Sequence, residues 1–265
     1  MFRWCSYCQT FIGESKPFED FSLTHGICKY CLKSVKNHSY QLTELTYDIQ
    51  NFFQELKQQI IDANQIDKNW VLIESRKLKI DPADLLAGVM QPLLYEIGKK
   101  FEKGELTVIQ EHQFSIFIKE LIHDLKNDSK SSRKNLKKTD VLLSSASGNY
   151  HEFGLSIIEF KLKRCDVSVE TLIPGVPAEQ LFEYARGKNA QIIGLSLSLI
   201  DQLPEAIQLG RLCQSHTTYH PQIFIGGYVV RDILTEIPGL TFHKGDINQL
   251  VENIAEVIKN NQKVA

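Results

Sequence analysis

Residues 141–154 read VLLSSASGNYHEFG, and this stretch decides the fold of the second half of the chain. A short apolar run, 141–143, ends in a turn of small polar residues, and a helical pattern follows it. The same alternation continues towards the C-terminus, with strand-like runs at 167–169, 192–195 and 223–225 and helical patterns at 151–164, 178–186, 203–216 and 247–259. Strands that alternate with helices predict an α/β domain with a parallel, doubly wound, Rossmann-like (flavodoxin-like) sheet over residues 139–262.

The residues upstream of this domain follow a different pattern. From residue 39 to residue 126, apolar side chains recur at three- and four-residue spacing, which predicts a bundle of four or five amphipathic helices. Asp81 and Pro82 form a typical helix start, with Asp81 as the N-cap and Pro82 at the first helical position. Residues 127–138 are polar, Ser-rich and basic, so we expect a linker between the two domains.

Four of the six cysteines lie in the first 31 residues, in two pairs with regular spacing. Cys5-x2-Cys8 is followed after 19 residues by Cys28-x2-Cys31, which is the spacing of a four-thiolate zinc site. A segment of about 35 residues is too short to fold on a hydrophobic core alone. We therefore expect a zinc ribbon-like module over residues 1–35, with structural zinc; the alternative is four free, buried thiols.

The residues around these cysteines resemble a known module. WCSYC (4–8) and THGICKYC (24–31) are similar to the short cysteine module that often follows PAS domains in bacterial sensor kinases. The resemblance implies a role in signalling rather than in metabolism. His25 lies within the matching stretch, and we interpret it as a local hydrogen-bonding residue because four cysteines already complete the ligand set.

Composition excludes several classes of protein. Hydrophobic residues make up 43 % of the chain, enough for a substantial core, which excludes a largely disordered chain. Thirty Lys and Arg against 32 Asp and Glu give a net charge of −2, which argues against binding to nucleic acid through bulk electrostatics. No apolar run approaches a membrane span and no signal peptide is evident, so we expect a cytoplasmic protein without membrane association.

The turn after the first strand of the α/β domain carries a histidine. Ligands of doubly wound sheets bind at the carboxyl ends of the strands, where His151 is placed. A glycine-rich phosphate loop is lacking, which disfavours a dinucleotide. His151 could instead ligate a metal through one ring nitrogen while Asn149, two residues before it, holds the other. The alternative is that His151 only caps the following helix.

Three motifs in this domain resemble the cobalamin (vitamin B12)-binding domain family, whose signature is Asp-x-His-x-x-Gly. Asn149-x-His151-x-x-Gly154 matches this signature with Asn in place of Asp, and two further family elements follow at later strand ends, Ser196–Ser198 and Gly226–Gly227. The resemblance implies that His151 is the lower axial cobalt ligand and that the small residues leave a slot for the nucleotide tail. An uncharged Asn149 would make His151 a less basic ligand. The full cofactor site implied on this domain is Asn149, Tyr150, His151, Glu152, Phe153, Gly154, Ser196, Leu197, Ser198, Gly226, Gly227 and Tyr228.

Residues 90–114 resemble the helical cap that precedes the cobalamin domain in corrinoid proteins. In the light- and redox-sensing cobalamin regulators, this cap carries a Trp, nine residues and then Glu-His; here Phe101 precedes Glu111 and His112 with the same spacing. The resemblance implies that Phe101, Val108, Glu111 and His112 line the upper face of the corrin, with His112 as an upper-ligand candidate. Phe leaves more room than Trp, so adenosyl-, methyl- and hydroxocobalamin all stay open. The alternative is an ordinary surface Glu-His pair.

These features lead to a functional hypothesis with two alternatives. The leading hypothesis is a cobalamin-binding sensor, either a photoreceptor or a redox sensor, in which a change of upper ligand moves the cap and signals. No segment of the sequence has the pattern of a DNA-binding helix. We therefore expect the protein to regulate transcription through a protein partner or a homo-oligomer interface rather than by binding DNA directly. The alternatives are a corrinoid methyl carrier for a methyltransferase system and a haem-binding sensor of the same fold. No catalytic residues are evident, so a self-contained enzyme is the least favoured class.

Overall fold

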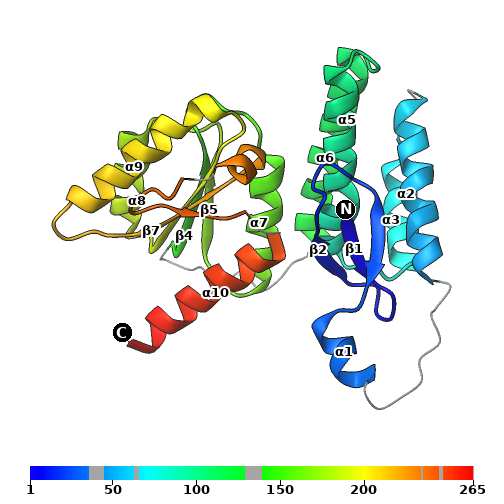
Figure 1. The fold of residues 1–265 in the computed structure, drawn as a ribbon, viewed down its shortest axis with the longest axis horizontal. Helices are drawn as coiled ribbons and strands as arrows, with labels where there is room; N and C mark the ends of the chain where they lie inside the picture. The colour runs from blue at the N-terminus through cyan, green and yellow to red at the C-terminus, as the bar shows by residue number, and fades with distance from the viewer. Residues whose placement is uncertain (36–44, 63–65, 129–138, 234, 245–246, 265) are drawn as a thin grey trace. The chain divides into compact units, whose positions relative to one another are not determined.

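The computed structural model describes residues 1–35, 45–62, 66–128, 139–233, 235–244 and 247–264. The chain divides into two compact units, Met1–Ser129 and Lys130–Ala265, whose elements are shown in Figure 1. Ten residues of the predicted linker, 129–138, lie outside the described residues, while Asn127 and Asp128 still belong to a helix. None of the helices described has both the length and the apolar character needed to cross a membrane.

The first unit begins with a small three-stranded sheet in the order β2-β1-β3, where β1 is Phe2–Cys5, β2 is Phe11–Glu14 and β3 is Leu23–Gly26. The central strand β1 pairs antiparallel with β2 and parallel with β3. A short helix, α1 (Lys29–Val35), follows β3 and carries the last cysteine of the cluster. The sequence pattern does not predict these strands, because each is only four residues long.

The remainder of the first unit is the predicted helical bundle. Its elements are α2 (Leu45–Ile61), α3 (Lys68–Lys77), α4 (Pro82–Leu85), a π-helical turn (Leu86–Met90), α5 (Gln91–Glu102) and α6 (Val108–Asp128). The predicted N-cap at Asp81 is confirmed, since its side chain accepts a hydrogen bond from the Ala83 N–H at 2.8 Å. Fully or almost fully buried apolar side chains fill the core of the bundle, among them Leu56, Val71, Leu86, Leu93, Phe114 and Leu121.

The second unit is the predicted parallel sheet. Its five strands are β4 (Val141–Ser145), β5 (Val169–Leu172), β6 (Ile192–Ser196), β7 (Gln222–Gly226) and β8 (Thr241–Phe242). They are all parallel and lie in the order β5-β4-β6-β7-β8, which is the flavodoxin-like order. The α/β fold class is therefore confirmed; the edge strand β8 was not predicted, because two residues give no readable period.

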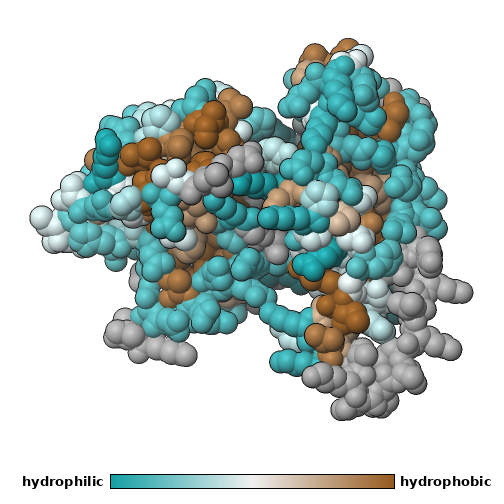
Figure 2. All heavy atoms as spheres, in the orientation of Figure 1, coloured by the Kyte–Doolittle hydropathy of each residue, from teal (hydrophilic) through white to brown (hydrophobic). Residues whose placement is uncertain are grey.

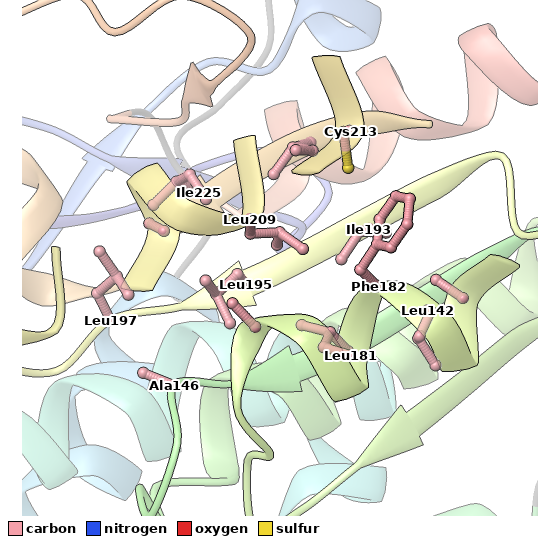
Figure 3. Packing of buried hydrophobic residues seen from close by; sticks show 14 of the residues in the cluster. Leu142, Ala146, Leu181, Phe182, Ile193, Leu195, Leu197, Leu209, Cys213 and Ile225 are labelled. Atoms are coloured by element: carbon pink, nitrogen blue, oxygen red, sulfur yellow. The ribbon is translucent and has the colours of Figure 1, made fainter. Parts of the chain in front are cut away.

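Helices cover both faces of this sheet (Figure 1): α7 (Phe153–Arg164), α8 (Ala178–Lys188), α9 (Leu203–Ser215) and α10 (Ile247–Val264). One core cluster joins the sheet to α8 and α9, where Phe182 and Leu209 pack against Ile193 and Leu195 (Figure 3). The other joins the sheet to α7 and α10. Because both faces are covered, the central strands β4, β6 and β7 are largely apolar on both sides, and the carboxyl end of the sheet is left to carry polar residues.

Candidate functional site

The four N-terminal cysteines meet in the first unit. Cys5 ends β1, Cys8 lies in the turn after it, Cys28 lies just before α1, and Cys31 lies within α1. Their four sulfurs all lie within 4.8 Å of one another, and the Sγ atoms of Cys8 and Cys28 are 3.7 Å apart. Tetrahedral zinc with four thiolates at about 2.3 Å requires sulfur–sulfur distances of about 3.8 Å. The cluster therefore has the donor set and the dimensions of a tetrathiolate metal site.

The backbone around the cluster favours thiolate sulfur. The N–H of Cys28 donates to the Sγ of Cys5 at 3.4 Å, and the N–H of Cys31 donates to the Sγ of Cys28 at 3.4 Å. Burial raises the pKa of Cys5, but backbone N–H groups outweigh this effect and lower the pKa to about 7. Burial and the neighbouring thiols raise the pKa of Cys31. A bound cation would compensate the charge of the thiolates gathered here.

In the second unit, the carboxyl ends of three neighbouring strands place the predicted cofactor residues together. Ser145 of β4 pairs with Ser196 of β6, and Ser196 pairs with Gly226 of β7, so the three residues form a line across the sheet. The loop after β4 carries Asn149 and the exposed His151. The motifs that are far apart in the sequence therefore lie together at the carboxyl end of the sheet.

The glycines at this edge serve two different purposes. Gly227 has a φ of 112°, and a Cβ there would lie 2.0 Å from the carbonyl oxygen of Leu197, so the backbone itself requires glycine. A Cβ on Gly226 or Gly154 would meet no atom within 4 Å. The chain does not need glycine at these two positions, so the open space at each is available to a bulky ligand.

Asn149 holds the histidine loop in an unexpected way. Its Oδ1 accepts a hydrogen bond from the backbone N–H of His151 at 2.8 Å, and its Nδ2 donates to the Ser198 Oγ at 2.8 Å. The expectation that the amide holds the second imidazole nitrogen therefore differs from the structure, because the Asx turn uses the acceptor on the backbone. The N-cap residue of α7 is Glu152, which makes no capping hydrogen bond with its side chain. His151 is thus a loop residue with an exposed side chain rather than a helix cap.

Gln202 belongs to the same network, although it was not predicted. Its Oε1 accepts from the backbone N–H of Ser198 at 2.7 Å and from that of Leu199 at 3.2 Å, and it lies 3.5 Å from the Asn149 Nδ2. Gln202 therefore joins the loop after β6 to the loop after β4. Its link to the first loop could not be predicted from nearby residues, because its partner there, Asn149, lies more than 50 positions away in the sequence.

A second side chain also fixes the loop after β4. The Oε2 of Glu205, at the start of α9, accepts from the backbone N–H of Ser147 at 2.8 Å. Burial raises the pKa of the Glu205 carboxyl, and the nearby Glu179 raises it further. The loop that carries His151 is thus held by one amide and one carboxylate, both from outside its own strand.

Large apolar side chains are exposed at the same edge. Tyr150 is 72 % exposed, and three others follow β6 and β7: Leu199, Ile200 and Tyr228. A soluble domain rarely gathers such residues without a ligand or partner. The carboxyl end of the sheet thus carries an exposed histidine, open space at two glycines and several exposed apolar side chains.

The predicted cap residues lie together at one end of the first unit, where α5 ends and α6 begins. Phe101, Val108 and the neighbouring Ile109 are all exposed there, and Figure 2 shows apolar side chains at this end of the two helices. Glu111 and His112 are in contact, with the Oε2 of Glu111 at 2.8 Å from the Nδ1 of His112. A carboxylate that accepts from Nδ1–H leaves the lone pair on Nε2, which is the form of histidine that binds metals.

Comparisons with known proteins bear on the family of the chain. Residues 53–126 match the family model described as B12 binding domain. The chain is 24 % identical over 181 residues to dimethylamine corrinoid protein 1 of Methanosarcina acetivorans. The aligned region covers 67 % of this chain and 84 % of that protein. These matches confirm the resemblance to the cobalamin-binding family, and the chain is similar to a corrinoid protein over most of its length.

The chain is also similar to a transcriptional regulator and to a corrinoid protein of known structure. Over 117 residues the chain is 29 % identical to the HTH-type transcriptional repressor CarH of Myxococcus xanthus, which covers 44 % of this chain and 38 % of that protein. The monomethylamine corrinoid protein of Methanosarcina barkeri has the same fold, with a TM-score of 0.66 and 18 % identity over 78 % of this chain and 99 % of that one. The extended similarity therefore lies with corrinoid proteins, and the shorter one with a regulator.

Proposed function

We propose that this chain is a corrinoid protein that binds cobalamin and presents a cobalt-bound methyl group to a partner methyltransferase. The observation that carries the proposal is the carboxyl end of the sheet, where the exposed His151 follows β4 and open space lies at Gly154 and at Gly226, the last residue of β7. Similarity to dimethylamine corrinoid protein 1 over 67 % of the chain supports it. This is the methyl-carrier alternative from the sequence, and the comparisons favour it over the sensor hypothesis.

The residues of the second unit have distinct roles in this proposal. His151 supplies the lower ligand, and Asn149, Ser198 and Gln202 hold its loop in place. The apolar rim, which includes Tyr150 and Tyr228, packs against the faces of the cofactor. Because the Asn149 amide is bonded to the backbone N–H of His151, its role is to set where the histidine emerges from the loop.

The cap residues of the first unit would cover the upper face. When bound, methylcobalamin supplies a methyl group on cobalt that a nucleophile can accept. Phe101 and Val108 provide an apolar surface that excludes water from that group. Because Phe is smaller than Trp, this surface suits a small upper ligand such as methyl better than adenosyl.

The proposal also includes a zinc ion on the cysteine cluster. Cys5, Cys8, Cys28 and Cys31 provide four sulfurs with no room left for a substrate ligand. The ion would be structural, because a small sheet of four-residue strands has little core of its own.

A sensor is the second candidate, and one observation favours it. The contact between Glu111 and His112 leaves Nε2 of His112 free to approach cobalt, as a light- or redox-driven change of upper ligand would require. The similarity to CarH agrees with this reading but extends over only 44 % of the chain. A signal in that case would pass to a protein partner.

The two functions are separated by one spectroscopic experiment. The protein is loaded with methylcobalamin, and absorption spectra are recorded in the dark, after illumination, and after addition of a thiol acceptor with a corrinoid methyltransferase. Loss of the methyl group to the acceptor in the dark, unchanged in His112→Ala, would support the carrier. A light-driven shift to a bis-histidine spectrum that disappears in His112→Ala would instead establish the sensor and overturn the carrier.

A further inference from the structure

The cysteine cluster is connected to helix α5 through one buried tryptophan. Trp4 directly precedes Cys5 on β1 and is only 2 % exposed. Its Nε1–H donates to the carbonyl oxygen of Gly88 at 3.3 Å. Gly88 lies at the centre of the π-helical turn Leu86–Met90, which leads without a break into α5. Cys5 is therefore connected to the turn that precedes α5 through its neighbour Trp4 and the hydrogen bond from Trp4 to Gly88.

Glycine at position 88 allows close packing of side chains against the backbone rather than serving as a hinge. A Cβ at this position would lie 2.3 Å from the Cζ2 of Trp4 and 2.8 Å from the Cδ2 of Phe11. The rings of Trp4 and Phe11 pack on each other, with centroids 5.6 Å apart. π-turns inside α-helices interrupt the regular hydrogen-bond ladder and are common at functional sites. Here the carbonyl oxygen of Gly88, within the π-helical turn, accepts a hydrogen bond from the indole N–H of Trp4.

Two more hydrogen bonds join the small sheet to the same segment. The backbone N–H of Phe11 on β2 donates to the Oδ2 of the buried Asp84 at 3.1 Å. The Nε2 of Gln91 donates to the Oε1 of Glu14 at 3.0 Å. Strands β1 and β2 are thus bonded to the start, middle and end of residues 84–91.

We infer that the metal held by the four cysteines positions helix α5, so that metal binding and cobalamin binding by the cap are coupled. The small sheet is made of four-residue strands, and without a metal its shape depends on few contacts. Loss of the metal releases β1, Trp4 leaves the π-turn, and α5 loses the contacts that fix its first turn. Phe101, near the end of α5, moves with the helix. This coupling rests on the proposed function, since it assigns the cap to cobalamin.

Hydrogen exchange on the full chain tests the positioning without any cofactor. Protein is prepared with zinc and after removal of zinc by a chelator, and amide exchange is compared across the helices. We expect protection to fall over residues 84–102 and to persist in α2 and α6, and readdition of zinc to restore it. Unchanged protection over residues 84–102 would overturn the inference. An equal loss over α2 and α6 would also overturn it, because it would indicate general unfolding.

Two glycine substitutions on the same helical segment test the contact itself. Gly88→Ala places a methyl group against Trp4, whereas a Cβ at Gly98, further along α5, meets nothing within 4 Å. Both variants are made in a Trp70→Phe background, so that Trp4 is the sole tryptophan and its emission reports on its surroundings. With zinc bound, we expect Gly88→Ala to shift this emission and to lower protection over residues 84–102. Gly98→Ala should do neither; equal behaviour of the two variants would contradict the inference.

Titration with hydroxocobalamin then tests the coupling. We expect the Kd to rise on the order of tenfold on zinc removal and in zinc-loaded Gly88→Ala, but not in Gly98→Ala. Equal affinity with and without zinc would overturn the coupling and leave the proposed function intact. Failure to bind cobalamin in either state would overturn the proposed function, and the exchange result would still decide whether the metal positions α5.

Discussion

The Oδ1 of Asn149 accepts a hydrogen bond from the backbone N–H of His151 at 2.8 Å, so the amide orients the loop rather than the imidazole. The same side chain donates from Nδ2 to the Oγ of Ser198, and the carbonyl of Asn149 accepts from the Oγ of Ser145 at 2.6 Å. Asn149 is only 5 % exposed. It thus links two strand ends and sets where the histidine emerges.

This relationship predicts a cost in stability when the amide is removed. Asn149→Ala leaves the His151 N–H and the Ser198 hydroxyl without their partner in a partly buried place, so the free energy of unfolding should fall by about 1–2 kcal/mol. Ser198→Ala removes only one of these bonds and should cost about 1 kcal/mol or less. Urea denaturation of both variants checks the order; a larger loss in Ser198→Ala would contradict the network described.

Substitution by alanine should have opposite effects at the neighbouring residues Gly226 and Gly227. Gly226→Ala meets no atom, so the stability should change by less than about 1 kcal/mol while cobalamin affinity falls, because the methyl group enters the ligand's space. Gly227→Ala is forced against the carbonyl of Leu197 at a φ of 112°, so the stability should fall by about 1–3 kcal/mol or more. Thermal unfolding and cobalamin titration measure both effects. Unimpaired binding by Gly226→Ala would argue against the assigned site.

Glu205 should make stability depend on pH in a defined direction. Burial raises its pKa in the folded protein, so the folded state binds the proton more tightly than the unfolded state. The contribution to stability is therefore present below the ordinary carboxyl pKa of 4.5 and is lost as the pH rises through the folded value. Glu205→Gln, which keeps an acceptor for the Ser147 N–H, should gain stability relative to the natural protein at pH 7 but not at pH 4. Denaturant melts at the two pH values check this; an equal effect at both would refute it.

The cysteine cluster makes a stoichiometric prediction. The purified chain should carry one zinc, measured by elemental analysis, and Cys5→Ser/Cys8→Ser should lose it, because two thiolates cannot complete a tetrahedral site. Cys165→Ser is the matched control, since Cys165 is exposed and lies outside the cluster. The same zinc content in the double variant and the natural protein would eliminate the site.

Much of the fold follows from local sequence signals. Buried strands such as Ile192–Ser196 form short apolar runs, and the helices of both units follow their apolar periods. The cysteine spacing predicts that the four sulfurs meet, and the short Asn149–Gly154 and Gly226–Gly227 motifs predict the edge at which the cofactor residues gather. Each of these signals depends on residues close together in the chain or on the general rule that parallel strands end at one edge.

The features that the sequence did not reveal depend on contacts between distant residues. Trp4 and Gly88 are 84 positions apart, and neither residue type indicates the other. Gln202 acts on a loop more than 50 residues away. The turn of Asn149 towards the backbone rather than the imidazole is a choice between two acceptable hydrogen bonds, and residue types alone do not decide it.

The most direct test of the central claim concerns the lower ligand. The protein is loaded with cobalamin, reduced to Co(II), and examined by electron paramagnetic resonance with natural-abundance and with ¹⁵N-labelled histidine. If His151 ligates cobalt, the nitrogen splitting should change from a triplet to a doublet on labelling, and this histidine splitting should disappear in His151→Ala. A triplet that persists in the labelled protein, or a doublet that survives in labelled His151→Ala, would contradict the assignment.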